Sequence, residues 1–224
     1  MNTLLHYDII VIGSGPAGQK AAIQGAKAGR RVAMIEREPG VGGGCVYRGT
    51  IPSKTLRESA VQADRMKQSS PMLDRQTPAI IMVSTLMRRL DEVVASHGDY
   101  MMNQLTRNGI VLFHGRAQFL TDRLIELLTI DGIKKTITAD TIIIATGSRP
   151  RAPVEIPIDH EHILDSDSIL SMIYLPRSLT VLGGGIIALE YASIFAALGV
   201  QVTIIDRSDR PLQFFDAELV QTFV

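Results

Sequence analysis

The sequence has a single cysteine, no excess of either charge and no long apolar run. Cys45 cannot form an internal disulphide bond, which excludes a disulphide framework or multi-thiolate metal site and suits a reducing compartment. Lys and Arg together number 23, as do Asp and Glu, so net charge favours neither nucleic acid nor an anionic membrane. No apolar stretch approaches the ~18 residues of a membrane span. The residues before the first expected strand, MNTLLH, are too few for a signal peptide. We therefore expect a cytoplasmic protein that binds neither nucleic acid nor membrane.

The composition is that of a folded globular chain, with 46% hydrophobic and 21% charged residues. At 224 residues, the chain has room for one large domain, or for one domain and part of a second. The five histidines show no ligand spacing, so the sequence indicates no metal site.

A dinucleotide-binding pattern begins at the first apolar run. Residues 7–12 (YDIIVI) are typical of a strand buried on both faces of a parallel sheet. GSGPAG follows, and residues 16–29 read as a helix with Pro at its first position and Gly at its end. Residues 31–36 then form a second expected strand that ends in Glu36. This order is typical of a βαβ unit that binds an adenine dinucleotide.

Each residue type in the pattern has a physical task. Gly13 makes the tight turn, Gly15 lets the backbone approach a pyrophosphate, and Gly18 lets helix and strand pack closely. The helix N-terminus offers free amides and a positive dipole end to phosphates. Glu36 is placed to accept hydrogen bonds from the ribose hydroxyls of the adenosine.

The same pattern returns 170 positions later, with strands at residues 179–182 and 202–206. The matching pairs are Gly13 and Gly183, Gly15 and Gly185, Gly18 and Ala188, Gly29 and Gly199, Glu36 and Asp206, and Arg37 and Arg207. Two copies imply two nucleotides. Asp206 favours NAD by accepting from the ribose 2′-hydroxyl, whereas Arg207 and Arg210 either pair with the 2′-phosphate of NADP or are ordinary solvated charges.

Helices and short strands are expected between the two copies. The apolar spacing predicts helices over residues 50–67 and 79–107, with Gly98 interrupting the second. Short antiparallel strands are expected at 110–113, 117–119, 124–129 and 134–139, forming a sheet laid over the first domain with a turn at Asp131 and Gly132. Residues 141–145 read as another buried strand, and Gly147 and Pro150 mark a domain junction.

At residues 42–54 (GGGCVYRGTIPSK) the chain resembles the redox-active segment of the pyridine nucleotide-disulphide oxidoreductases, which include dihydrolipoamide dehydrogenase, glutathione reductase and mercuric reductase. The family carries two cysteines there, and the second position is Thr50 in this chain. One branch keeps the first cysteine and carries threonine at the second. The chain is similar to that branch, a Si-specific NAD(P)+ transhydrogenase type, through Glu36 with Arg37 and through residues 13–18, 41–45, 49–54, 147–150, 165–172 and 190–195.

The resemblance implies an α/β chain: an FAD-binding Rossmann-like domain with an inserted antiparallel sheet over residues 1–150, then the start of a second Rossmann-like, NAD(P)-binding domain over 151–224. It implies FAD as cofactor and NAD(H) and NADP(H) as substrates. It also implies that both domains are incomplete in this chain, and that the full-length homodimer uses an interface domain that is not present.

Chemistry agrees with that branch, because disulphide exchange requires a partner thiol that Cys45 lacks. Hydride transfer through a flavin needs no thiol. The expected reaction is NADPH plus NAD+ giving NADP+ plus NADH. Two alternatives stay open: a dihydrolipoamide dehydrogenase-like flavoprotein without its redox disulphide, and a non-catalytic FAD-binding fragment.

Site residues follow from the fingerprints and the resemblance. Lys54 and Glu190 are the candidate catalytic residues, paired beside the flavin, although Lys54 could instead be a solvated helix residue. Cys45 is either a small buried residue without reactivity or a thiol that touches the flavin. The candidate FAD contacts are Gly13, Ser14, Gly15, Pro16, Ala17, Gly18, Glu36, Arg37, Gly43, Gly44, Cys45, Thr50, Lys54, Ala145, Thr146 and Gly147. The candidate nicotinamide nucleotide contacts are Gly183, Gly185, Ala188, Glu190, Asp206 and Arg207.

Overall fold

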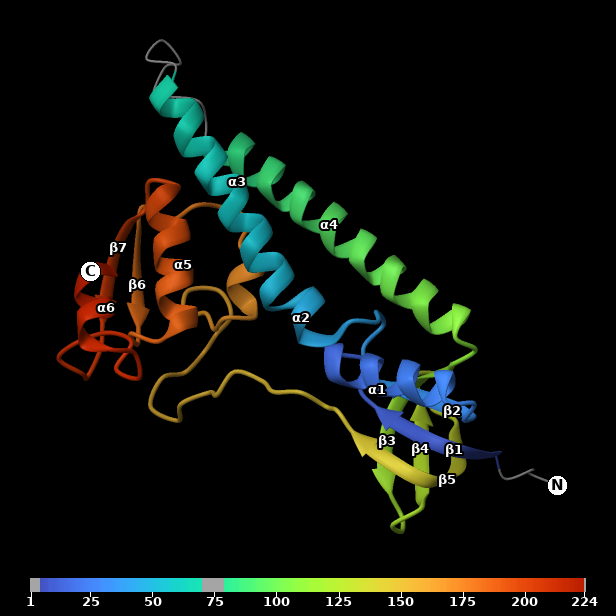
Figure 1. Cartoon of the computed structure of the whole chain (residues 1–224). Coiled ribbons are helices and arrows are strands. Elements are labelled where there is room, and N and C mark those ends of the chain that lie inside the picture. The colour runs from blue at the N-terminus through green and yellow to red at the C-terminus, as the bar shows by residue number, and fades with distance from the viewer. Residues whose placement is uncertain (1–4, 70–78, 224) are drawn as a thin grey trace. The chain divides into compact units, whose positions relative to one another are not determined.

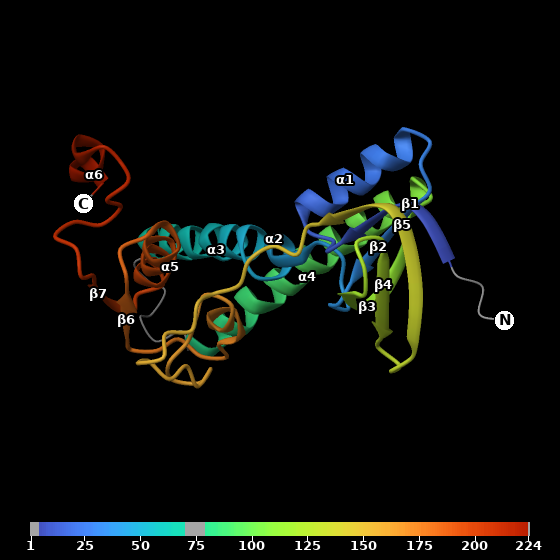
Figure 2. The same cartoon turned by 90° about the horizontal axis from the view of Figure 1, so that it is seen from below.

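The computed structural model describes residues 5–69 and 79–223, and these form two compact units (Figures 1 and 2). The first unit comprises Met1–Ile51 and Glu92–Arg151, and the second comprises Pro52–Asp91 and Ala152–Val224. Residues 52–91 thus cluster with the second unit. The assignment of residues 1–150 to FAD and 151–224 to a nicotinamide nucleotide stays a prediction.

A closed arrangement of five strands forms the first unit. Its elements are β1 (Leu5–Ile12), α1 (Pro16–Lys27), β2 (Val32–Glu36), α2 (Gly43–Tyr47), β3 (Val111–Phe119), β4 (Leu124–Thr129) and β5 (Lys134–Ile144). Strand β1 pairs in parallel with β2 and β5, and β2 pairs in parallel with β3. Strand β4 pairs antiparallel with both β3 and β5, which closes the sheet. Figure 2 shows α1 running alongside β1.

Alternating side chains divide the interior of the first unit between two hydrophobic clusters. Ile10 points into one cluster with Ile125 and Ile137, inside the closed sheet. Its neighbour Val11 points to the opposite face, where it packs with Met34 from β2. All five residues of β2 are buried, as expected for a strand covered on both faces.

Two pairs of expected strands are continuous in the structure. The expected strands at 110–113 and 117–119 merge into the single strand β3, which begins at Val111. The strand continues because Gly115 stays in the ladder and lacks a Cβ that would lie 2.3 Å from the carbonyl oxygen of Leu128. Residues 134–139 and 141–145 likewise form one strand, β5, that ends at Ile144. The antiparallel sheet therefore extends the parallel sheet and does not lie over it as a separate layer.

The two long helices, α3 (Thr50–Ser69) and α4 (Ala79–Arg107), each begin in one unit and end in the other. Helix α4 is not interrupted at Gly98 as expected, because this glycine serves a close contact. A Cβ atom on Gly98 would lie 2.7 Å from the hydroxyl oxygen of Tyr47.

The second unit contains a two-stranded parallel sheet, and the helix that connects its strands packs against both of them. Its own elements are the 3-10 turn η1 (Ser168–Ser171), β6 (Ser178–Leu182), α5 (Ile186–Ala197), β7 (Gln201–Ile205) and α6 (Ala217–Phe223). Helix α6 was not predicted from the sequence. Its core joins Leu56 and Ala60 of α3 to Tyr191, Ile194 and Phe195 of α5. Apolar packing against α5, the helix of the second fingerprint, therefore holds the α3 segment that belongs to this unit.

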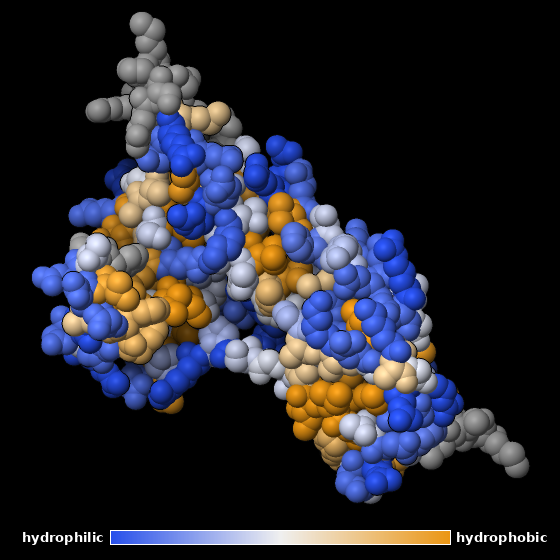
Figure 3. Space-filling view, in the orientation of Figure 1, coloured by the Kyte–Doolittle hydropathy of each residue, from blue (hydrophilic) through white to orange (hydrophobic). Residues whose placement is uncertain are grey.

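Apolar side chains also remain on the surface, and Figure 3 shows hydrophobic areas on both units. In the second unit, large exposed side chains gather at the ends of β6 and β7 and at the start of α5: Leu182, Ile186, Ile187, Ile204 and Ile205. No helix in the described part of the chain combines the length and apolar character that a membrane span requires.

Candidate functional site

The turn between β1 and α1 has the tight geometry that its glycines predict. Gly13 has a φ of +104°, and a Cβ atom there would lie 2.3 Å from the carbonyl oxygen of Ala145. A Cβ atom on Gly18 would lie 1.9 Å from the carbonyl oxygen of Gly13. Gly15 differs from both, because no protein atom lies within 4 Å of its missing Cβ. Gly15 directly precedes α1, and a ligand that approaches the helix N-terminus needs this open space.

Glu36 ends β2 as a buried carboxylate, only 6% exposed, that the backbone and Ser14 hold in place. Its Oε2 accepts from the Ser14 amide at 2.8 Å and from the Ser14 hydroxyl at 2.6 Å. Its Oε1 accepts from the Glu38 amide at 2.9 Å. A carboxylate offers about four lone-pair directions, so one acceptor direction remains for a ligand hydroxyl.

Ser14 also joins this carboxylate to the segment that carries the cysteine. The Ser14 hydroxyl oxygen is fully buried and accepts from the Gly42 amide at 3.1 Å. Gly43 follows at the start of α2, and its missing Cβ would lie 2.8 Å from Cα of Gly15. One packed assembly therefore contains the glycine turn, the Glu36 carboxylate and the start of α2.

The other candidate residues of the first unit lie around these elements. Pro16 and Ala17 are exposed in the first turn of α1, and Thr146 and Gly147 are exposed just after β5. Cys45 is half-buried in α2 and forms no disulphide, and Gly44 beside it is exposed. Thr50 is exposed where α3 begins.

A charged cluster next to this assembly was not predicted from the sequence. The Oε1 atom of Glu38 lies 2.6 Å from Arg149, 3.2 Å from Arg37 and 3.5 Å from Arg48. Burial alone would raise the pKa of Glu38, but the three arginines outweigh it and hold the pKa below its ordinary value. The sequence contains no signal for this cluster, because Arg149 is 111 residues from Glu38.

The second fingerprint repeats the backbone bonds of the first at the same 170-residue offset. The amide of Gly13 donates to Ile35 at 2.8 Å, and that of Gly183 donates to Ile205 at 2.7 Å. Gly15 and Gly185 both precede their helices in an extended conformation. The helix ends match too, with Gly29 donating to Ala26 and Gly199 to Ala196, each at 2.9 Å. The repeat read from the sequence is thus a repeat of structure, with half-buried Ala188 in the place of Gly18.

The acids of the two copies differ in how firmly they are held. Gly184 stands where the first copy has Ser14, so no hydroxyl is available to the second acid. Asp206 is exposed and accepts a hydrogen bond, at 3.4 Å, from the amide of Ser208. Arg207 beside it is also exposed, whereas Arg210 donates to the carbonyl of Gln213 at 3.3 Å. The second acid is therefore the freer of the two.

Lys54 and Glu190 form the ion pair that was expected, and both belong to the second unit. The side chain of Glu190 is 19% exposed and that of Lys54 is 60% exposed. Lys54 is thus both paired and largely open to solvent, and its place beside the flavin stays a prediction.

The fold and the repeated fingerprints define a class of protein. The family described as pyridine nucleotide-disulphide oxidoreductase matches residues 7–223, and the chain belongs to this family. Soluble pyridine nucleotide transhydrogenases from Mycobacterium tuberculosis and Azotobacter vinelandii are 46% and 42% identical to it, over 224 and 216 residues. Each alignment covers 96% of this chain and 46% of the relative. The chain therefore spans about half the length of the curated relatives it matches.

Solved structures show the same fold. The Cu(II) complex of the HOCl-induced flavoprotein disulfide reductase RclA from Escherichia coli superposes with a TM-score of 0.83 at 30% identity, over 97% of this chain and 46% of that one. LpdA from Mycobacterium tuberculosis superposes with a TM-score of 0.85 at 26% identity, over 98% and 48% of the two chains. The α/β class with Rossmann-like units, expected from the sequence, is confirmed.

Proposed function

We propose that this chain is part of an FAD-dependent oxidoreductase that transfers hydride between NADPH and NAD+. The names of the curated relatives and the flavoprotein neighbour support this proposal. So does the presence of two nucleotide fingerprints, since a flavin enzyme that uses a nicotinamide nucleotide must hold both. Its single cysteine, Cys45, suits a cytoplasmic location and a reaction that needs no thiol pair.

The first fingerprint is the proposed FAD site, and its residues fit the adenosine and pyrophosphate parts of that cofactor. The open space at Gly15 and the amides at the start of α1 suit the phosphates. Glu36 keeps one acceptor direction for a ribose hydroxyl, and Ser14 holds the carboxylate in position. The bound flavin would accept and return a hydride, while the protein supplies position and electrostatics.

The contrast between the two acids is the observation that carries this assignment. Glu36 is buried and bonded three times, so its geometry is set before a ligand arrives. A site organised in advance loses less freedom on binding and suits a resident cofactor. Asp206 is exposed and weakly held, which suits a substrate that must bind and leave in every turnover. We therefore assign the exchanging nicotinamide nucleotide to the second fingerprint.

Lys54 and Glu190 are the proposed catalytic pair, on the strength of the resemblance and of their ion pair. The Si-specific course of the reaction and the homodimeric state of the full-length protein are proposals that rest on the resemblance alone. Transfer of deuterium from stereospecifically labelled C4 of NADPH would test the first. Light scattering from the full-length protein would test the second.

The decisive experiment has two stages. The purified chain is first examined for a flavin absorption spectrum, and any released chromophore is identified as FAD or FMN. The chain is then assayed with NADPH and thio-NAD+ as acceptor. Bound FAD with turnover supports the proposal, and FAD without turnover supports a non-catalytic FAD-binding fragment. NADH formation that depends on dihydrolipoamide would instead support the dihydrolipoamide dehydrogenase-like alternative.

Cys45→Ser is the matched control for the thiol in that assay. Because hydride transfer through a flavin involves no thiol exchange, we expect this variant to keep most of its transhydrogenase turnover. Complete loss of turnover, with FAD still bound, would contradict the proposed reaction.

A further inference from the structure

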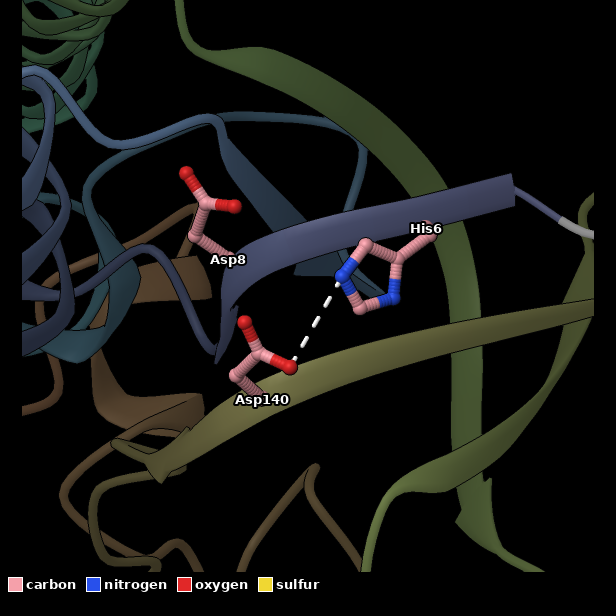
Figure 4. Close-up of side chains that lie close together, drawn as sticks. All are labelled: His6, Asp8 and Asp140. Carbon is pink, nitrogen blue, oxygen red and sulfur yellow. Dashed lines mark ion pairs between the residues drawn. The ribbon is translucent and has the colours of Figure 1, made fainter.

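Near the start of β1, one face of the closed sheet carries a cluster of three metal-ligating side chains. His6 and Asp8 lie two residues apart on β1, and Asp140 lies on the neighbouring parallel strand β5 (Figure 4). One ligand atom from each side chain lies within 4.8 Å of the other two. Their neighbours Tyr7 and Ala139 point the other way, into the hydrophobic cluster of the closed sheet. The alternation of the two strands therefore places all three ligand groups on the outer face.

A hydrogen bond outside the cluster orients the imidazole of His6. Its Nδ1 lies 3.2 Å from the hydroxyl oxygen of Thr138, and that hydroxyl is directed at the carbonyl oxygen of Leu5 at 3.4 Å. A ring proton on Nδ1 can be donated to this hydroxyl while the hydroxyl donates its own proton to Leu5. In the neutral ring, Nε2 then presents its lone pair towards Asp140, whose Oδ1 is 3.7 Å away. Imidazoles that bind metals are oriented by this kind of bond through the other nitrogen.

A lone pair that faces a carboxylate oxygen is repelled by it unless a proton or a metal cation lies between the two atoms. In a tetrahedral zinc site, ligand atoms at about 2.0–2.1 Å from the ion stand about 3.4 Å apart. The 3.7 Å between His6 Nε2 and Asp140 Oδ1 is close to this value, and ligand atoms of all three groups lie within 4.8 Å of one another. The side chains of His6 and Asp140 are 45% and 63% exposed, so rotation of these groups is not blocked by packing.

Charge balance at the cluster also favours a dication. Asp8 and Asp140 contribute two carboxylate charges to the cluster. The one cation beside them among the described residues is Arg31, whose Nε is 4.0 Å from Asp8 Oδ1 and whose side chain is 67% exposed. The Arg31 amide holds the other Asp8 oxygen at 2.7 Å, which fixes the carboxylate without neutralising it.

We propose that His6, Asp8 and Asp140 bind a divalent transition-metal ion with nitrogen and oxygen ligands, of the Zn²⁺ class, which ties β1 to β5. One imidazole and two carboxylates suit Zn²⁺ better than Mg²⁺ or Ca²⁺, which prefer oxygen ligands alone. Asp140 lies 132 residues after Asp8 in the chain, so the spacing of histidines in the sequence carried no sign of this site.

The test titrates the chain with Zn²⁺ alone, by calorimetry, and compares His6→Gln and Asp140→Asn with the unchanged protein. Loss of either ligand should weaken the strongest Zn²⁺ binding at least tenfold, and Thr138→Val should weaken it by about tenfold through the orientation of the ring. His162→Gln is the matched control, because His162 pairs with the single carboxylate of Asp159. Equal loss in the control, or no loss in the two ligand variants, would overturn the proposal.

A second measurement identifies the ligand atoms. Co²⁺ in place of Zn²⁺ should give only weak visible bands that disappear in His6→Gln. A strong thiolate-to-cobalt band in the near ultraviolet would place the ion at Cys45 and would also overturn the proposal. Both ligand substitutions are at partly exposed side chains, and thermal unfolding without metal shows whether the variants fold like the unchanged chain.

Discussion

At the residue scale, Ser14 connects the acid Glu36 with the Gly42 amide at the start of α2. Ser14→Ala removes both hydroxyl bonds and leaves Glu36 buried with one partner fewer, at a cost of about 1–3 kcal/mol in unfolding free energy. Because Glu36 would also lose its fixed orientation, we expect weaker FAD binding, measured by quenching of flavin fluorescence. Ser178→Ala, at an exposed serine, is the control. Unchanged stability and affinity in Ser14→Ala would show that the hydroxyl has no organising role.

Asp206 governs the choice of nucleotide at the second fingerprint if it contacts the ribose there. A carboxylate accepts from the 2′-hydroxyl of NAD(H) and repels the 2′-phosphate of NADP(H). We expect Asp206→Ala to strengthen NADP(H) relative to NAD(H), by about tenfold for the loss of one such contact. Dissociation constants for both reduced nucleotides measure this ratio. An unchanged ratio would remove Asp206 from the site.

Glu38 gives a pH dependence whose sign follows from its three arginines. Its pKa lies below the ordinary value of 4.5, so the cluster stabilises the fold above pH 4.5 and loses this effect as pH falls through the depressed pKa. We expect Glu38→Gln to lower the unfolding free energy at neutral pH, with a difference that shrinks in acid. Because the group is partly exposed, each pair contributes about 0.2–1 kcal/mol. Urea unfolding at neutral pH and at a pH below 4.5 measures the difference in unfolding free energy. The control Glu126→Gln removes the single ion pair with Lys134 and should lower the unfolding free energy by less. A difference that grows in acid would contradict the assignment.

At the element scale, we expect two glycines at the junction of β1 and α1 to have different roles: Gly18 is required for packing, and Gly15 is required for ligand binding. Gly18→Ala would place a Cβ atom 1.9 Å from the Gly13 carbonyl oxygen, so we expect a loss of about 1–3 kcal/mol or failure to fold. Gly15→Ala meets no protein atom within 4 Å, so we expect an unchanged melting temperature with strongly reduced FAD binding. Thermal unfolding and flavin titration of both variants distinguish the two effects. Equal destabilisation by both, or unimpaired FAD binding in Gly15→Ala, would contradict this division.

Local patterns explain what the sequence could predict, and long-range contacts explain what it could not. The two βαβ units were predictable because turn, helix and acid lie within 30 residues of one another in the sequence. Gly98 and Gly115 misled the prediction, since a glycine reads as a break while the structure uses its small size for close contact with Tyr47 and with Leu128. Partners far apart in sequence, such as Glu38 with Arg149, carry no local pattern.

At the scale of the whole molecule, each unit has a core of its own. Ile10 and Val11 of β1 lie in the clusters of the first unit, whereas Ile194 and Phe195 of α5 lie in that of the second. Since each fingerprint belongs to one of these cores, a nucleotide should stabilise most directly the unit whose fingerprint it occupies. Amide hydrogen exchange reports stability locally, so it can separate the two sites within one chain.

FAD should therefore slow exchange at the amides of β1 and β2, and NADH should slow it at β6 and β7. At a free ligand concentration of about 100 times Kd, the stabilisation is about 2.7 kcal/mol, or about 100-fold slower exchange at amides that open by unfolding. Gly15→Ala should abolish the effect of FAD and leave that of NADH, because it alters the first fingerprint only. Protection of β6 and β7 by FAD, with β1 and β2 unaffected, would reverse the assignment of the two sites. It would also show that a firmly held acid, as at Glu36, does not mark the site of the resident cofactor.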